Sequence, residues 1–95
     1  MATKTIERSF PGRGADEIYA AVEALVRKMA AKLSLECAYD PAARHITARG
    51  PLGISADCRV EDGHARLDLT HGLTGALVAG QARSIIEEKL DGLFR

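Results

Sequence analysis

The sequence has no tryptophan, and aromatic residues make up only 4% of its 95 residues. It also has no net charge, because 13 Lys and Arg residues balance 13 Asp and Glu residues. A neutral chain lacks the broad basic surface that attracts nucleic acid, so we expect no nucleic-acid partner. Because much of the apolar content is alanine, we expect a modest hydrophobic core.

Long apolar runs are missing as well. No segment approaches the roughly 20 apolar residues that a transmembrane helix needs. No apolar stretch follows the first residues, as it would in a secretory signal. We therefore expect a cytoplasmic protein without a transmembrane segment, and 95 residues fit a single domain covering 1–95.

The two cysteines, Cys37 and Cys58, are too few for a disulfide framework. Both fall at apolar positions of alternating segments, and another predicted strand lies between them. Two strand spacings are about 9.5 Å, which is more than a disulfide spans between Cα atoms. We expect two reduced thiols packed in the core.

Two segments have the periodicity of amphipathic helices. In 15–33, apolar residues recur at steps of three and four from Ile18 to Leu33. Acidic residues begin this segment and basic residues end it, which complements the helix dipole. The second helix is predicted over 74–94, although Gly75 and Gly80 weaken its first turns.

Five segments predict strands because apolar and polar residues alternate in them or β-formers gather there. They cover 3–10, 35–40, 45–49, 54–60 and 65–70, and Asp62-Gly63 predicts a hairpin before the last of them. The fold class is α+β: one antiparallel five-stranded sheet in the order β-α-β-β-β-β-α, with both helices on its apolar face. If the first strand pairs with the last, the strand order is 2-3-4-5-1, a reduced helix-grip arrangement. Mixed charges on the other face predict cross-strand pairs in contact with water.

Catalytic and metal motifs are missing from the sequence. His45, His64 and His71 lack metal-ligand spacing, and the serines lack a nucleophile elbow. The stretch Pro11-Gly12-Arg13-Gly14 lacks the rest of a dinucleotide or phosphate-loop fingerprint. We therefore expect no cofactor, no metal and no enzymatic activity.

The most unusual stretch is the uncharged segment 72–82, which joins the last strand to the last helix. It has two interpretations. Its glycines can allow a close-packed helix start, or Leu73 and Leu77 can form an apolar contact surface for a partner chain or a hydrophobic body.

Four segments carry a family resemblance over nearly the full length: Ile6-Glu7-Arg8-Ser9, Gly53-Ile54-Ser55-Ala56, 65–69 with the uncharged segment after it, and 85–91. With them the chain resembles the polyhydroxyalkanoic acid system proteins, a small bacterial family. It departs from the family pattern at Phe10, where His is usual, and over 72–80, where the family has a bulkier connection. The resemblance implies an accessory protein that accompanies polyhydroxyalkanoate synthesis, with no established activity and no catalytic residues to carry over.

These observations leave three hypotheses. The first is a non-enzymatic accessory or binding protein, with a protein partner or a storage-granule surface contacting Leu73 and Leu77. The second is a small-ligand-binding protein or enzyme that uses a cleft between the C-terminal helix and the sheet, with His71 and Arg8 as its polar residues. The third is a homodimer formed through an edge strand or the open sheet face.

Overall fold

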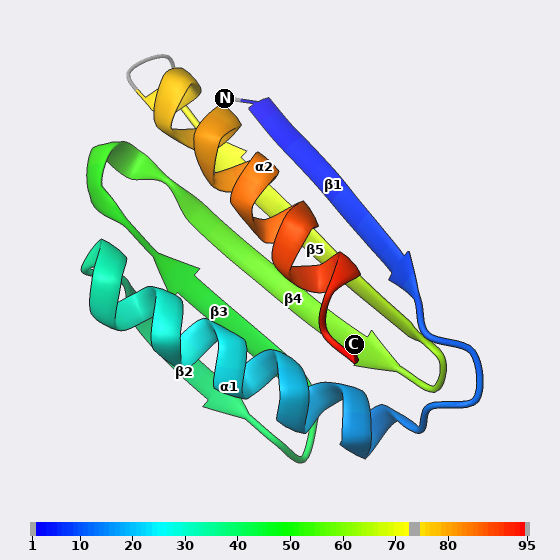
Figure 1. Cartoon of the computed structure of the whole chain (residues 1–95). Coiled ribbons are helices and arrows are strands. Elements are labelled where there is room, and N and C mark those ends of the chain that lie inside the picture. The colour runs from blue at the N-terminus through cyan, green and yellow to red at the C-terminus, as the bar shows by residue number, and fades with distance from the viewer. Residues whose placement is uncertain (1, 73–74, 95) are drawn as a thin grey trace.

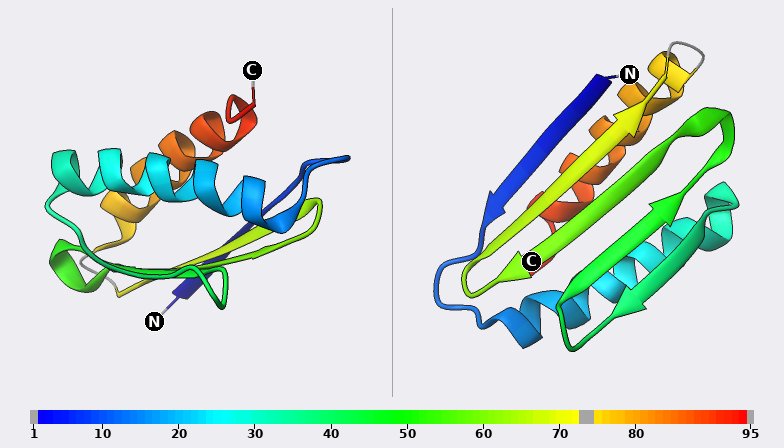
Figure 2. Two further views of the ribbon diagram at one scale, coloured as in Figure 1. Left: turned by 90° about the horizontal axis from the view of Figure 1, so that it is seen from below. Right: turned by 180° about the vertical axis from the view of Figure 1, so that it is seen from behind.

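The computed structural model describes residues 2–72 and 75–94. Five strands form one sheet, and both helices lie on the same side of it (Figures 1 and 2). The predicted fold class is therefore confirmed. In chain order the elements are β1 (Ala2–Ser9), α1 (Ala15–Leu33), β2 (Glu36–Asp40), β3 (His45–Arg49), the 3₁₀ turn η1 (Pro51–Gly53), β4 (Ser55–Glu61), β5 (His64–His71) and α2 (Ala76–Asp91).

The sheet order is β1-β5-β4-β3-β2, and every neighbouring pair is antiparallel. This is the predicted order, read from the opposite edge. It arises because α1 carries the chain from one edge strand, β1, across the sheet to the other edge, β2 (Figure 1). The helix-facing side chains of the strands then meet α1 and α2 in one core, which contains the following buried residues: Ile6, Ala15, Ile18, Tyr19, Val22, Ile46, Ile54, Cys58, Val60, Ala65, Leu67, Leu69, Ala79, Ile86 and Leu90.

Helix α1 spans the predicted residues 15–33. Its first turn has no side-chain cap from Gly14; instead, Asp62 Oδ1 accepts a 2.7 Å hydrogen bond from the Ala15 N–H. A capping carboxylate satisfies a free amide and favours the positive end of the helix. The cap comes from the β4–β5 hairpin, so a distant turn fixes where this helix begins.

That hairpin is one part of a closed end of the molecule, which we call the hairpin end. Gly63 has φ +71°, as the predicted Asp62-Gly63 turn requires. Its N–H donates to Arg13 O at 2.9 Å, and its carbonyl accepts from the Phe10 N–H at 2.7 Å. The ring of Phe10 meets Phe94 edge-on at 5.3 Å, and the Arg13 guanidinium lies 4.3 Å from the Phe94 centroid. The hairpin, the β1–α1 loop and the C-terminal segment therefore hold one another together.

Helix α2 is shorter than the predicted 74–94, because it ends at Asp91 and Gly92 follows as its cap. At its start, Gly75 approaches η1 and β4 closely. A Cβ added there would lie 3.0 Å from Leu52 O and 3.1 Å from Ile54 Cγ1. The close-packed helix start expected of the glycines is thus found at Gly75, whereas Gly80 has only the Lys4 Nζ nearby, at 4.0 Å.

The other face of the sheet is polar, but its charges are arranged differently from the prediction. Between β4 and β5, Asp57 faces Asp68 and Arg59 faces Arg66, so the expected cross-strand ion pairs are wrong there. The ion pairs run along each strand instead, with Nε–Oδ1 distances of 3.4 Å for Arg59–Asp57 and for Arg66–Asp68. From β3, His45 Nε2 lies 2.7 Å from Asp57 Oδ1.

Among the described residues, neither helix is long and apolar enough to cross a bilayer.

Candidate functional site: an apolar groove between the helices

An apolar groove lies between α1 and α2, with the sheet as its floor. Each helix packs against strands, and no comparable contact joins the two helices within the described residues. The space between them contains two hollows of about 130 Å³ and about 60 Å³, which share lining residues and form what we call the interhelical groove. Five residues line both hollows: Met29, Leu35, Ala48, Ala56 and Ile86.

Small side chains explain why the groove stays open. Ala48 and Ala56 lie directly opposite each other on β3 and β4, in the middle of the sheet. Ala82 of α2 lines the larger hollow above them. Protein interiors are normally packed to the density of organic crystals, and three alanines at facing positions cannot fill the space between two separated helices. Ala48 and Ala56 are accordingly only half-buried, although their strands are central.

The groove is almost entirely apolar. Among the described residues that line it, Ser55 and Arg66 are the only polar ones. Such a lining offers dispersion contacts and exclusion of water, but few groups that could hold or move a proton. The geometry is that of a binding site for apolar material.

Three exposed leucines belong to elements that contribute lining residues to the larger hollow. Leu33 ends α1 and lines the larger hollow, Leu52 lies in η1, and Leu77 begins α2 beside the groove residue Val78. Their exposed fractions are 41%, 54% and 75%. We call these three residues the groove mouth. Exposed large apolar side chains that gather beside an apolar hollow are typical of an interaction surface.

The structure separates the four predicted binding residues. Leu77 lies at the groove mouth, whereas Leu73 lies outside the described residues. His71 is buried at 7% exposure, close to Gly75 at the start of α2. Its Nδ1 lies 3.0 Å from Gly72 O, and its Nε2 is buried without a hydrogen-bond partner among the described residues. His71 lines neither hollow of the groove.

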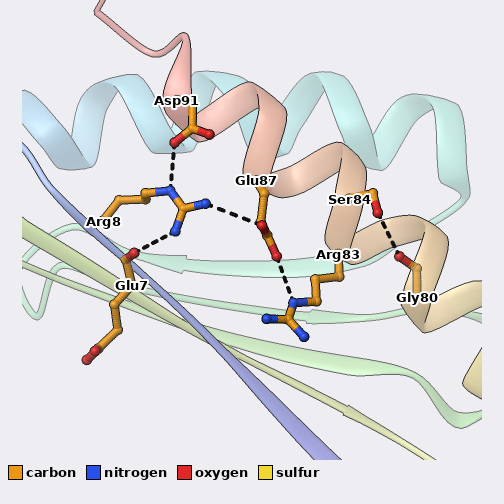
Figure 3. A network of polar contacts seen from close by, with 7 residues as sticks. All are labelled: Glu7, Arg8, Gly80, Arg83, Ser84, Glu87 and Asp91. Atoms are coloured by element: carbon orange, nitrogen blue, oxygen red, sulfur yellow. Dashed lines mark hydrogen bonds and ion pairs between the residues drawn. The ribbon is translucent and has the colours of Figure 1, made fainter.

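Arg8, the fourth predicted residue, joins β1 to α2 (Figure 3). Its Nε donates to Asp91 Oδ1 at 2.7 Å, its Nη1 to Glu7 O at 2.8 Å, and its Nη2 to Glu87 Oε2 at 3.4 Å. The hydrogen bond to Asp91 raises the pKa of Arg8. Arg83 extends the network by donating to Glu87 at 2.7 Å. These ion pairs explain why an arginine occupies an apolar position of β1. Arg8 lines neither hollow of the groove.

The cysteines are free, on β2 and β4 with β3 between them, as predicted. Cys58 is buried and lines the smaller hollow, and desolvation by burial raises the pKa of its thiol to about 12. Cys37 is only half-buried and lies outside the core, so the expectation of a core thiol is wrong at this position. Across residues 2–72 and 75–94, no group of three or more His, Cys, Asp or Glu could hold a metal ion.

Sequence reasoning missed the interhelical groove. The expected cleft lay between the C-terminal helix and the sheet and was to reach His71 or Arg8, but the groove opens toward α1 instead. The sequence feature that could have indicated the groove is alanine at the apolar positions 48, 56 and 82. Alternation identifies the side of a strand that faces the core, but it does not report the volume that remains there.

Comparison with known proteins gives one match. The model of the family described as polyhydroxyalkanoic acid system protein matches residues 5–94. Neither the curated proteins nor the solved structures contain a match to the chain. The matched range covers both helices, β2 to β5 and residues 5–9 of β1, and therefore every residue that lines the groove.

Proposed function

Because the chain belongs to the polyhydroxyalkanoic acid system protein family, we propose that it is a non-enzymatic accessory protein of polyhydroxyalkanoate storage, working in the cytoplasm. It binds apolar material, and the surface of the stored polyester is the partner that fits best. The single observation that carries this proposal is the groove mouth, where Leu33, Leu52 and Leu77 are exposed beside an apolar hollow.

The chemistry of the mouth supports binding to an apolar surface. Fully burying one leucine side chain contributes about 1.5–3 kcal/mol. Three leucines from three different elements present such area together, and η1 and the start of α2 are held against each other by the close contact at Gly75. A preformed apolar patch loses little conformational entropy when it binds.

Cosedimentation with polyhydroxyalkanoate particles tests the proposal. We expect the wild-type protein to sediment with the particles and the double variant Leu52→Glu/Leu77→Glu to remain in the supernatant. Both leucines are exposed, so the variant should keep the wild-type circular dichroism and melting temperature.

A matched control places the same charges elsewhere. Ala20 and Ala24 are exposed on α1, and the variant Ala20→Glu/Ala24→Glu should bind the particles like the wild type. If the folded Leu52/Leu77 variant binds as well as this control, the groove mouth is not the contact surface. If the wild type itself fails to sediment, the polyester is not the partner.

The second candidate function is small-ligand binding, and the two hollows between the helices favour it. The groove is about as large as an apolar cavity that admits a small hydrocarbon.

A further inference from the structure

The outer and inner sides of the two helices carry different charges. On its outer side, α1 has Glu23 paired with Arg27, whose guanidinium lies 4.1 Å from the centroid of the Tyr39 ring on edge strand β2. On its outer side, α2 has Glu87 and Asp91 bonded to Arg8 of the opposite edge strand. Glu23, Glu87 and Asp91 are therefore occupied on the sides that face away from the groove, whereas Glu88 is exposed beside Lys89.

Three lysines lie on the inner sides in the same region. Lys28 and Lys32 each follow a groove-lining residue, Leu25 or Met29, by three positions, so they lie on the same side of α1 and farther from the sheet. Lys89 follows the groove-lining Ile86 by three positions on α2. All three lysines are exposed, and none has an ion-pair partner in the part of the chain that the structure describes.

The two observations describe an amphipathic site. A lysine buries its methylene stem along apolar surface and keeps its ammonium in water, so the three lysines extend the apolar walls and end in a positive rim. Glu88 reduces the charge near Lys89, whereas Lys28 and Lys32 keep theirs without an ion pair to any carboxylate of the described residues. The floor beneath it is formed by Ala48 and Ala56 of the sheet, with Ile86 of α2 beside them, and is apolar.

We propose that the interhelical groove binds a single linear acyl chain that ends in a carboxylate, with the chain on the alanine floor and the carboxylate at the lysine rim. The charge complementarity of the rim selects an anion, and the shape of the groove between two antiparallel helices selects an unbranched chain. The inference deepens the proposed function, because it rests on the groove being a binding site and names the ligand class for its interior.

Isothermal titration calorimetry with octanoate, decanoate and dodecanoate, below their micelle concentrations, tests the inference. We expect one site per chain. Each added methylene that the groove accommodates should lower the Kd by about fourfold, the equivalent of about 0.8 kcal/mol. Decanol should bind more weakly than decanoate, and the difference should shrink at high salt, because the rim charges are exposed and screened.

Two variants separate the rim from the floor. Lys28→Gln/Lys32→Gln should raise the Kd of decanoate by about fivefold and leave that of decanol unchanged. Ala82→Met fills the larger hollow with a good helix former and should abolish binding of both ligands. The exposed variant Ala20→Gln/Ala24→Gln adds no charge beside the rim, so it is the control for both and should leave both Kd values unchanged.

The results discriminate this inference from the proposed function. Decanoate binding that is lost in Ala82→Met, with particle binding retained, supports a ligand site distinct from the groove mouth. Equal affinity for decanol and decanoate overturns the role of the lysines. No decanoate binding by a folded, monomeric wild type overturns the inference even if the particles bind. A dimer seen by light scattering also overturns the inference if decanoate binds only after the dimer dissociates. A second copy of the chain would then be the occupant of the groove.

Discussion

The hairpin end and the groove mouth differ in how far their apolar side chains are covered. At the hairpin end, Phe10 and Phe94 pack edge-on beneath Arg13, and the backbone of Gly63 bonds to the loop that begins α1. At the groove mouth, Leu33, Leu52 and Leu77 stay exposed, and Gly75 closely approaches Leu52 of η1 at the start of α2. The comparison indicates that one end is closed by packing and hydrogen bonds, while the other leaves large apolar side chains exposed.

The largest expected difference in the free energy of unfolding is between a variant of one core residue near the hairpin end and a variant of one leucine of the groove mouth. Ile18 is fully buried in the first turns of α1, so Ile18→Ala should lower the free energy of unfolding by about 3 kcal/mol through lost burial and a new cavity. Leu77→Ala, at 75% exposure, should change it by less than about 0.5 kcal/mol. Urea denaturation of both variants measures the contrast. Equal losses would contradict the division into a packed end and an exposed end.

The next effect concerns the cap that the hairpin supplies to α1. Asp62→Ala removes the acceptor for the Ala15 N–H and should cost about 1 kcal/mol. Glu61→Ala, at the exposed neighbouring position, is the control and should leave stability nearly unchanged. Thermal melts followed by circular dichroism compare the two. An effect of Asp62→Ala no larger than that of the control would mean that solvent caps the helix equally well.

The smallest effect has the opposite sign and concerns the groove. Ala82→Met places additional apolar atoms into the larger hollow, where the helices leave space. The gain from burial exceeds the cost in side-chain entropy, so the variant should be more stable by about 1 kcal/mol. Denaturant midpoints of wild type and variant test this, with Ala24→Met as the exposed control. A destabilised variant would mean that the groove is already filled by its own side chains.

Local patterns in the sequence predicted α1 and the hairpin at Asp62-Gly63, because periodicity and turn chemistry depend on neighbouring residues. The strand order needed one further assumption, the pairing of the first strand with the last, which the structure confirms. Local patterns could not explain why an arginine lies at position 8 of β1. Its partners, Asp91 and Glu87, lie 83 and 79 residues away in the sequence. The groove was out of reach for a similar reason. The groove depends on the separation of two helices that are more than 40 residues apart in the chain. An alanine at position 82 is equally compatible with a tightly packed core and with an open one, so its identity does not reveal the separation.

The like-charged neighbours on the polar face bear on how the sheet assembles. In the native pairing of β4 with β5, Asp57 faces Asp68 and Arg59 faces Arg66. Sliding β5 by two residues would keep every side chain on its face and bring an arginine opposite an aspartate. Surface electrostatics thus favours a misaligned hairpin. The two-residue Asp62-Gly63 turn and the bonds from Gly63 to the loop before α1 hold the native alignment against this preference.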